Sequence, residues 1–457
     1  MTAAAPDADG ATGRPAPPTR AEAFRFWLKL GFISFGGPAG QIAIMHRELV
    51  DRRRWISERR FLHALNYCML LPGPEATQLA TYLGWLLHRT RGGIVAGTLF
   101  VLPSAVILGA LAWIYVRWGQ VPAIASALAG VKPVVVAIVL HAAWRIGRRA
   151  LRHPGLWTIA FAAFVAMQVF EVPFPAIVAA AALAGVALAR AAPHAIAGGP
   201  PRAAGSGAHA SAVIDDDTPT PAHARWSRRR FAVTVVAFLA IWAAAYGALV
   251  AAFGASGTLA AMGWLFTKAA LLTFGGAYAV LPYIVQNAVD HHGWLTAAQM
   301  IDGLALGETT PGPLIMIVAF VGFVGAWTHA PFGPDALGLA GAAGTAVATF
   351  FTFLPSFLFI LAGGPLVEAT HGDARVAAPL TGITASVVGV IASLAVFFGI
   401  HVFWPAGFDA ARPLSGLDGV SVAIFAAAVV ALFRFGAGVV TLVGAGALAG
   451  LLRLAAG

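Results

Sequence analysis

The stretch LLPGPEAT at residues 70–77 interrupts an apolar segment with Pro-Gly-Pro, and TTPGPLIM at residues 309–316 interrupts a second one. The two Pro-Gly-Pro sequences lie 239 residues apart, and the same spacing carries Phe35-Gly36-Gly37 onto Phe274-Gly275-Gly276. One spacing shared by separated features indicates an internal repeat. Two copies of one unit therefore make up most of the chain.

The repeat extends beyond these breaks, because Leu102-Pro103-Ser104 matches Leu354-Pro355-Ser356 at a spacing of 252. Between the copies lies a stretch rich in Ala, Gly, Pro and Ser, whose composition cannot build a core. An apolar segment without a counterpart in the first copy follows it. The predicted divisions are a disordered tail over 1–20, a first transmembrane domain over 21–192, a disordered cytoplasmic linker over 193–230, a connecting transmembrane helix over 231–257 and a second, inverted domain over 258–457.

The composition is that of a protein embedded in the lipid bilayer. Of the 457 residues, 59% are hydrophobic and 11% are charged, and the mean hydropathy is +0.80. Apolar stretches recur along the chain, each long enough to cross roughly 30 Å of hydrocarbon. We predict an all-α polytopic membrane protein with about 9 to 13 membrane segments. The net charge of +10 sits in short loops, so it indicates topology and not a nucleic-acid partner.

The distribution of basic residues predicts the orientation of the two copies. Of the 29 Lys and Arg residues, 24 precede residue 231, and the segment 46–60 contains six Arg where its equivalent, 285–299, contains none. Basic loops stay on the cytoplasmic side. The equivalent loops therefore lie on opposite faces of the membrane. The extra segment 231–253 adds one crossing, which reverses the orientation of the second copy. Two inverted-topology repeats of this kind are typical of secondary transporters.

The Pro-Gly-Pro and Phe-Gly-Gly sequences predict broken helices. Basic segments precede and follow the apolar residues 61–87, and both are predicted to be cytoplasmic. A single crossing would place them on opposite sides of the membrane, so the apolar segment must enter and return. Its Pro-Gly-Pro divides it into two pieces that each cover about half a bilayer at ~1.5 Å per residue. We therefore predict re-entrant broken helices at all four breaks. Their prolines are Pro38, Pro72, Pro74, Pro311 and Pro313.

Broken helices at membrane depth predict an anion site. Non-helical backbone is tolerated there only where protein or a watery cavity satisfies it, so the four breaks should meet. Half-helices that begin at the breaks would present free N–H groups and positive dipole ends. Gly and Pro could instead serve only to kink and pack the helices, but their recurrence at matched positions favours a site. Its glycines are Gly36, Gly37, Gly73, Gly275, Gly276 and Gly312.

Polar side chains near the breaks are the candidate ligands. Lys29 and Lys268 each precede a Phe-Gly-Gly by six residues, and intramembrane Lys is rare enough to indicate function. Lys29 could instead extend toward the interface. The further anion-binding candidates are Thr309, Thr310, Asn66 and Gln78, although such side chains also tie helices together.

Two carboxyl groups flank the Pro-Gly-Pro breaks asymmetrically. Glu75 follows the first break, whereas Glu308 precedes the second, and Leu314 occupies the position equivalent to Glu75. Burial favours the neutral form of a carboxyl group, which suits a proton carrier, so both are candidates for proton coupling. Glu75 could alternatively be a first-turn helix acid. Asp302 lies nearer to the end of its segment, which favours a structural role.

Several classes of protein lack their signatures here. Cys68 is the only cysteine, which excludes disulfides and thiolate metal clusters within one chain. The sequence contains no Walker A, HExxH or GxSxG motif, and no haem or flavin signature supports a membrane reductase. The pair His291-His292 has no further ligands nearby. We predict no enzyme activity, no cofactor and no metal, with transport driven by an ion gradient or by the substrate's own gradient.

These motifs resemble the chromate ion transporter (CHR) family in its long, two-domain form. The resemblance covers both copies, and only the tails and the central linker lie outside it. The stretches that carry it are FGGPAGQIAIM (35–45), LNYCMLLPGPEATQLATYLGWLLHRTRGG (65–93), FGGAYAVLPYIVQ (274–286) and GWLTAAQMIDGLALGETTPGPLIM (293–316).

The resemblance implies a multi-pass protein of the bacterial inner membrane that exports chromate, confers chromate resistance and is coupled to protons. Sulfate, a structural analogue, is the expected competitor. The second copy departs from the first, with Ala277 where Pro38 stands, so the two domains could play unequal roles. An importer of sulfate or another oxyanion, an anion channel and a homo-oligomeric assembly remain open.

Overall fold

The structure is a computed structural model that describes residues 15–35, 37–192, 211–219, 221, 223–274, 276–367 and 374–456. Over these residues the chain is helical, and its single β-bridge pairs Ile56 with Ile214. Six of the described helices are long and apolar enough to cross a membrane, and five shorter helices are also apolar. These observations confirm the prediction of an all-α polytopic membrane protein.

The first half contains seven α-helices and one turn of π-helix. Side-chain caps and prolines begin several of them: Ser57 accepts a hydrogen bond from the N–H of Arg60 at the start of α3, and α5, α6 and α7 have proline in the first turn. The bounds are α1 (Arg20–Ile33), α2 (Gly37–His46), η1 (Arg47–Arg52), α3 (Glu58–Cys68), α4 (Glu75–Trp118), α5 (Pro122–Ala150), α6 (Pro154–Gln168) and α7 (Phe174–Ala191).

A connecting helix, α8 (Arg228–Phe253), precedes the second half. The second half repeats the order of short and long helices of the first. Its elements are α9 (Thr258–Leu272), α10 (Ala277–Val285), η3 (Gln286–His291), α11 (Ala297–Thr309), η4 (Leu314–Met316), α12 (Ile317–His329), η5 (Pro334–Ala336), α13 (Leu337–Val367), α14 (Ala374–Phe403), α15 (Gly419–Phe435) and α16 (Val439–Ala455).

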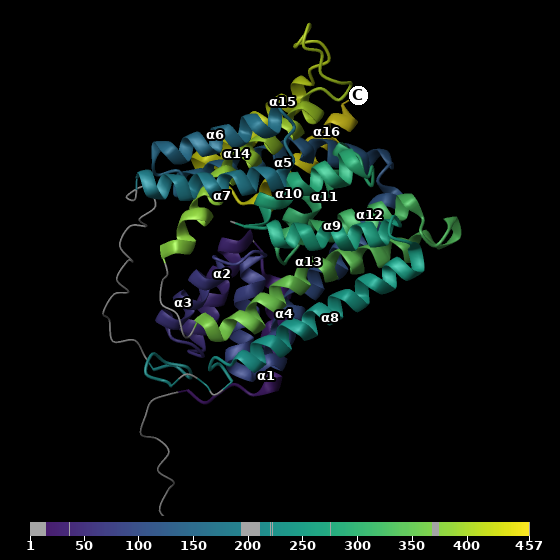
Figure 1. Cartoon of the computed structure of the whole chain (residues 1–457). Helices are drawn as coiled ribbons and strands as arrows, with labels where there is room; N and C mark the ends of the chain where they lie inside the picture. The colour runs from purple at the N-terminus through teal and green to yellow at the C-terminus, as the bar shows by residue number, and fades with distance from the viewer. Residues whose placement is uncertain are drawn as a thin grey trace, which may run out of the picture.

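The helices form two bundles, and each bundle takes helices from both halves. In one, α5, α6 and α7 pack against α14, and α5 also packs against α15 and α16. In the other, α13 packs against α4, α8, α9 and α12, and α1 packs against α4. Helices α10 and α11 lie between the two bundles and contact both (Figure 1). The elements that begin or end at the breaks are therefore central.

The first half contains two re-entrant hairpins that return to one face. The ring of Phe26 in α1 lies 5.3 Å from that of Trp55, which follows α2. Further along, Nε2 of His88 lies 3.0 Å from the carbonyl oxygen of Pro18, just before α1. The backbone leaves helical geometry at His88 and Arg89, so the chain reverses there and then continues along the rest of α4. The prediction of re-entrant broken helices is confirmed in this half.

The second half repeats this arrangement. Met262 near the start of α9, Trp294 after η3 and Gly325 near the end of α12 lie together: a Cβ atom on Gly325 would be 2.7 Å from Met262 Cε and 2.8 Å from Trp294 Cβ. The starts and ends of the hairpins α9–α10 and α11–α12 therefore share one face.

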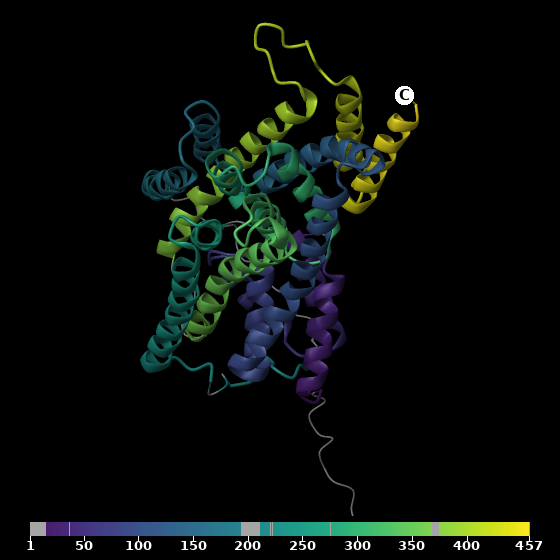
Figure 2. The ribbon, with the colours of Figure 1, turned by 90° about the vertical axis from the view of Figure 1, so that its right-hand side faces the viewer.

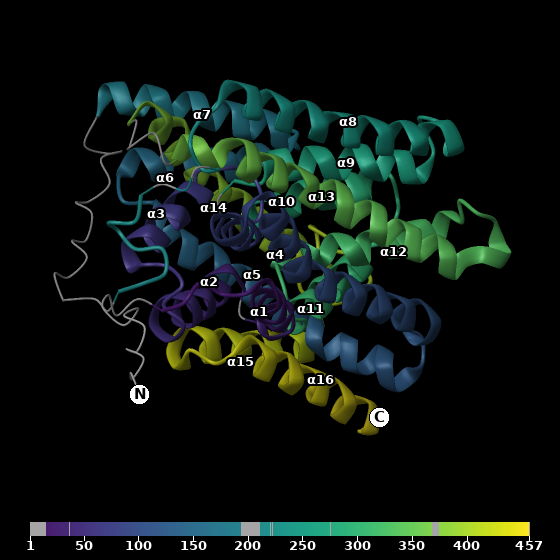
Figure 3. The ribbon, with the colours of Figure 1, turned by 90° about the horizontal axis from the view of Figure 1, so that it is seen from below.

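Helix α8 places the two halves in opposite orientations. It follows His223, whose ring nitrogen lies 3.0 Å from the carbonyl oxygen of Trp85 in the first half. Its last residue, Phe253, packs at 5.4 Å against Phe332, beside the second pair of hairpins. Its 26 residues span about 39 Å. Figure 2 shows this teal helix at the edge of the molecule, and Figure 3 shows it running alongside α13. The two pairs of hairpins thus open to opposite faces, as expected for an inverted repeat.

The second part of the predicted linker is packed against the first half, which differs from the disorder expected over 193–230. Ile214 exchanges backbone hydrogen bonds with Trp55 and Ser57, at 3.1 and 3.0 Å. The hydroxyl of Ser57 donates to Asp216 at 2.6 Å, and Arg60 donates to the carbonyl oxygen of Thr218. Backbone and side-chain groups of residues 55–60 satisfy these groups, a partner that composition cannot reveal. Residues 193–210 lie outside the described residues.

Candidate functional site

The two Pro-Gly-Pro breaks contact the two Phe-Gly-Gly breaks of the opposite halves. The N–H of Gly73 donates to the carbonyl oxygen of Thr273 at 2.7 Å, and the N–H of Gly312 donates to the carbonyl oxygen of Ser34 at 2.8 Å. These two hydrogen bonds are repeat equivalents, because each residue maps onto its counterpart at the spacing of 239. All four breaks therefore meet at one place, between the halves.

Only glycine fits at the centre of each Pro-Gly-Pro. Gly73 has φ +118° and Gly312 has φ +110°, which L side chains rarely adopt. A Cβ atom on Gly73 would lie 2.6 Å from Oγ of Ser356, and one on Gly312 would lie 2.5 Å from Cβ of Ser104. These serines are equivalent too, at the spacing of 252. Each glycine thus lets a serine of the other half approach the backbone.

Helices begin at each break, with their N-termini at the meeting point. Helix α2 begins at Gly37 and α4 at Glu75, after Pro74. In the second half α10 begins at Ala277, and η4 begins after Pro313 and leads into α12. The first N–H groups of a helix have no intrahelical acceptor, and the N-terminal end carries a positive partial charge. Four such ends at one place favour an anion.

Three buried hydroxyl groups at these breaks are without a protein hydrogen-bond partner. Oγ1 of Thr77 and the Oγ atoms of Ser104 and Ser356 have none among the residues that the structure describes. Two amides are already engaged: Gln78 donates to the carbonyl oxygen of Pro72 at 2.7 Å, and Gln41 donates to that of Gly312 at 2.5 Å. The free hydroxyl groups can donate to an oxyanion, and the amides brace the breaks.

Glu308, at the second break, belongs to a cluster with Tyr278 and Arg145. The hydroxyl of Tyr278, in the first turn of α10, donates to Oε1 of Glu308. Arg145 of α5 is close enough for its charge to act on both groups. The cluster joins α5 of the first half to α10 and α11 of the second. It places a carboxyl group beside the helix N-termini, within range of a cation.

Glu75, at the first break, has a different neighbour. It is the first residue of α4 and is half-buried, and it interacts electrostatically with the buried thiol of Cys68. Its position at a helix N-terminus also fits the alternative of a first-turn acid.

The two predicted lysine ligands lie on the helices that lead into the Phe-Gly-Gly breaks, α1 and α9. Lys29 is exposed on α1, and Lys268 is half-buried with its ammonium 5.6 Å from the centre of the Trp264 ring. Their role as anion ligands therefore stays a prediction. Asn66 is likewise exposed, on α3.

Thr309 and Thr310 lie at the second break, but their hydroxyl groups donate to backbone carbonyl oxygens, at 2.9 Å to Leu306 and 3.0 Å to Gly307. They remain able to accept a hydrogen bond.

The Phe-Gly-Gly glycines are described in part. Gly37 has φ +66° and Gly276 has φ +103°, so both use the freedom that glycine has at positive φ. Pro38 occupies the first turn of α2. Gly36 and Gly275 lie outside the described residues.

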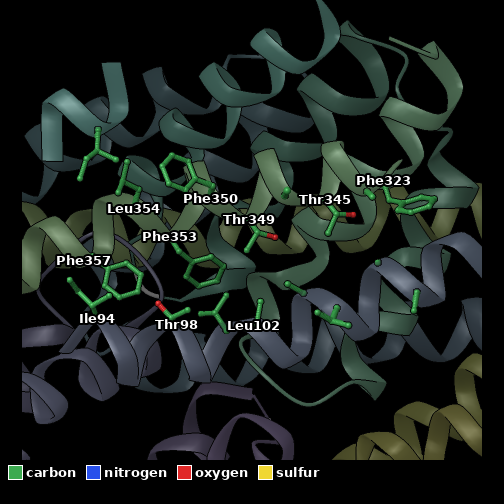
Figure 4. A pocket seen from close by; sticks show the side chains of 18 of the residues that line it. Ile94, Thr98, Leu102, Phe323, Thr345, Thr349, Phe350, Phe353, Leu354 and Phe357 are labelled. Carbon is green, nitrogen blue, oxygen red and sulfur yellow. The ribbon is translucent and has the colours of Figure 1, made fainter. Parts of the chain in front are cut away.

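The large cavity between α4 and α13 is not suited to an anion. It has a volume of about 820 Å³, and its lining is apolar apart from the hydroxyl groups of Thr98, Thr345 and Thr349 (Figure 4). It also borders α8, through Phe238 and Ile241. A dianion would lose its hydration there and gain no more than these three hydroxyl donors and no cation, so the breaks are the better candidate.

Sequence reasoning missed several residues that the fold brings to the breaks. Ser104 and Ser356 carried a signal, since the matched Leu-Pro-Ser sequences place a serine in both copies. Arg145 gave none, because basic residues near the end of a membrane segment are expected for topology alone. Tyr278 gave none either, since an aromatic residue in an apolar segment is usually part of the core.

Comparisons with known proteins agree with this architecture. A family model described as "Chromate transporter" matches residues 21–186 and 260–451. The "Chromate transport protein" of Pseudomonas aeruginosa is 35% identical over 386 residues, which are 84% of this chain and 82% of that protein. The "Chromate transport protein" of Cupriavidus metallidurans is 28% identical over 80% of this chain and 79% of its own length.

A shorter relative reflects the repeat. The "Uncharacterized transporter YwrA" of Bacillus subtilis is 32% identical over 132 residues, which are 29% of this chain but 74% of that protein. No solved structure matches the chain. The family model covers both halves on either side of the linker and of α8, and the relative from Pseudomonas aeruginosa matches across most of its length. The chain therefore belongs to the chromate transporter family.

Proposed function

We propose that this chain is a secondary transporter that exports chromate across the bacterial inner membrane and so confers resistance to it. The observation that carries the proposal is the pair of equivalent hydrogen bonds from Gly73 to Thr273 and from Gly312 to Ser34, which closes four helix N-termini on one another. Relatives named as chromate transport proteins match both halves, and this supports chromate as the substrate.

The donors around the breaks suit a small tetrahedral dianion. Chromate offers four oxygen atoms, and the free hydroxyl groups of Thr77, Ser104 and Ser356 approach the breaks from both halves. Helix N-termini add N–H donors and positive partial charge. Arg145 supplies a full positive charge at the second break. Sulfate has the same shape and charge, so we expect it to compete.

The membrane potential favours export of a dianion. Moving one elementary charge across 100 mV is worth about 2.3 kcal/mol, so a dianion leaving a cell that is negative inside gains about 5 kcal/mol per 100 mV. Alternating access between two inverted halves provides the route. Import of sulfate or another oxyanion would have to work against the membrane potential.

Proton coupling is assigned to Glu75 and Glu308. Both carboxyl groups lie at the breaks where the oxyanion would bind, so their charge and that of the substrate affect each other directly. Glu308 is held by Tyr278 and faces Arg145. We propose that it changes protonation during the transport cycle, with Glu75 as a second candidate, at a non-equivalent position of the first half.

The test is accumulation of labelled chromate in inside-out membrane vesicles, with and without an uncoupler, against vesicles that lack the protein. Export predicts accumulation that saturates, is abolished by the uncoupler and is reduced by sulfate. Flux that does not saturate and ignores an imposed pH gradient would indicate an anion channel instead. Absence of chromate accumulation, with sulfate uptake by right-side-out vesicles, would favour an importer.

A further inference from the structure

A second charged cluster lies away from the breaks, between α5 of the first half and α11 of the second. Nζ of Lys132 is 3.4 Å from Oδ2 of Asp302, and the hydroxyl of Tyr115 in α4 donates to the same oxygen at 3.0 Å. Lys132 lies in one of the long apolar helices that can cross a membrane. The cluster therefore joins three helices from two halves at membrane depth.

Asp302 is buried but incompletely satisfied. Its side chain is 5% exposed, whereas that of Lys132 is 25% exposed. Its second oxygen, Oδ1, has no hydrogen-bond partner among the described residues. An ion pair kept only for stability is expected to satisfy its remaining lone pairs, because a buried pair otherwise contributes little or is unfavourable. The ammonium group of Lys132 is the more accessible partner, so it could exchange one anion for another.

The pair lies on the same two helices as the groups at the second break. Helix α5 carries Lys132 and Arg145, 13 residues and about 20 Å apart. Helix α11 carries Asp302 and Glu308, six residues and about 9 Å apart. Lys132 faces Asp302, and Arg145 acts on Glu308. Asp302 thus lies on α11 between the second break and the face where α11 begins, and Lys132 contacts it there.

Charged side chains inside a membrane are costly and usually mark an ion pathway. Arg453 and Asp418 provide a contrast within the same chain. Their ion pair is shorter, 2.7 Å, but the Arg453 side chain is 54% exposed, and Asp418 precedes α15 in a loop. A surface pair of that kind needs no role in transport. The position of Lys132, and not its charge alone, is what requires an explanation.

We propose that Lys132 is a second oxyanion-binding station between the breaks and the face where α11 begins, and that Asp302 is its exchangeable counterion. The proposal rests on the proposed function, because it needs an oxyanion that moves between the breaks and that face. At rest the carboxylate of Asp302 holds the ammonium group. An arriving oxyanion takes its place, and the carboxylate closes on Lys132 again when the oxyanion leaves.

The test compares four variants in the inside-out vesicles, with initial rates of chromate uptake measured against concentration and divided by the amount of folded protein. Asp302→Asn leaves Lys132 without its counterion, so the station holds the oxyanion longer: we expect KM and kcat both to fall, by about tenfold. Because an unpaired buried Lys can also prevent folding, Lys132→Met/Asp302→Asn removes both charges together.

The double variant separates the two explanations. If Lys132 is a station, the folded double variant still has a kcat about tenfold below that of the unmodified protein, while Lys132→Arg retains most of it. Asp418→Asn, in the surface pair, should leave kcat and KM unchanged. Wild-type kcat and KM in the double variant would overturn the proposal and leave the pair a structural one.

Failure of the proposed function gives a different result. If the unmodified protein accumulates no chromate, the export proposal fails, and the same variants are compared with labelled sulfate in right-side-out vesicles. The same ordering of variants with sulfate would retain the station for another oxyanion. If neither oxyanion is transported by the unmodified protein, both proposals fall.

Discussion

The Pro-Gly-Pro breaks of the two halves have the same backbone and different side chains. Gly73 and Gly312 share positive φ, donate equivalent hydrogen bonds and receive a serine from the other half. Around them, the first half has Thr77 and Gln78 where the second has apolar residues at the equivalent positions, 316 and 317.

The second half carries its own polar groups. Glu308 and Tyr278 stand where the first half has Met69 and Ala39. The backbone symmetry explains how two inverted copies close on each other, since each provides the acceptor for the other. The side-chain asymmetry indicates unequal roles of the two breaks, with Thr77 and Gln78 beside the first and the Tyr278–Glu308 pair beside the second.

The largest loss of chromate uptake should come from substitutions in the backbone that the two Pro-Gly-Pro breaks share. Alanine at Gly73 or Gly312 places a Cβ atom within 2.6 Å of a serine side chain at positive φ, and the conformation alone costs about 1–3 kcal/mol. We expect either variant to lose chromate uptake and to melt at lower temperature, by similar amounts. The melting temperature and the vesicle assay measure this.

Gly416→Ala is the matched control, because Gly416 also has positive φ but has open space around its Cβ position. It should keep transport. Tolerance of alanine at only one of the two breaks would contradict the equivalence of the halves.

The different side chains at the two breaks predict that Glu308→Gln and Glu75→Gln reduce transport by different amounts. Glu308→Gln removes the acid that Tyr278 and Arg145 hold, so uptake driven by an imposed pH gradient should fall by about tenfold or more. Glu75→Gln should have the smaller effect, because its titratable neighbour is the thiol of Cys68. Initial rates of chromate uptake by the two variants, measured with and without the imposed pH gradient, test this difference. Equal losses would mean that the two halves share the coupling role.

Removing a free hydroxyl tests whether both halves contact one oxyanion. Ser104 and Ser356 have no hydrogen-bond partner for Oγ among the described residues, so alanine at either removes no internal bond and should not lower the melting temperature. A hydrogen bond to a charged group is worth about 1.5–3 kcal/mol, so KM should rise about tenfold or more in each variant. An unchanged KM would remove that serine from the site.

The smallest effect concerns residues 211–219 of the linker, which hydrogen-bond to the first half. Asp216→Ala removes the exposed hydrogen bond from Ser57, worth about 1 kcal/mol. Transport should stay within about twofold of the unmodified protein, while the linker becomes more sensitive to a protease. A large loss of transport would indicate that the linker takes part in the cycle.

The sequence predicts the backbone of this protein better than its side-chain contacts. A break at membrane depth restricts residue choice to glycine and proline, and these stand out at Pro72-Gly73-Pro74 and its copy. Which side of a helix faces the breaks depends on its rotation in the packed bundle. Spacing alone does not show that Lys29 is exposed on α1 or that Lys268 lies over the Trp264 ring. Arg145 likewise resembles a topology signal, and only the fold brings its charge within range of Glu308.

The measurement that tests the account most directly is the sidedness of two equivalent residues. Arg52 and His291 are 239 residues apart, and both are exposed. In a Cys68→Ala background, an impermeant thiol reagent applied to intact cells should label His291→Cys and not Arg52→Cys, and inverted vesicles should give the reverse. Labelling of both positions from one side would contradict the inverted repeat and, with it, the site between its halves.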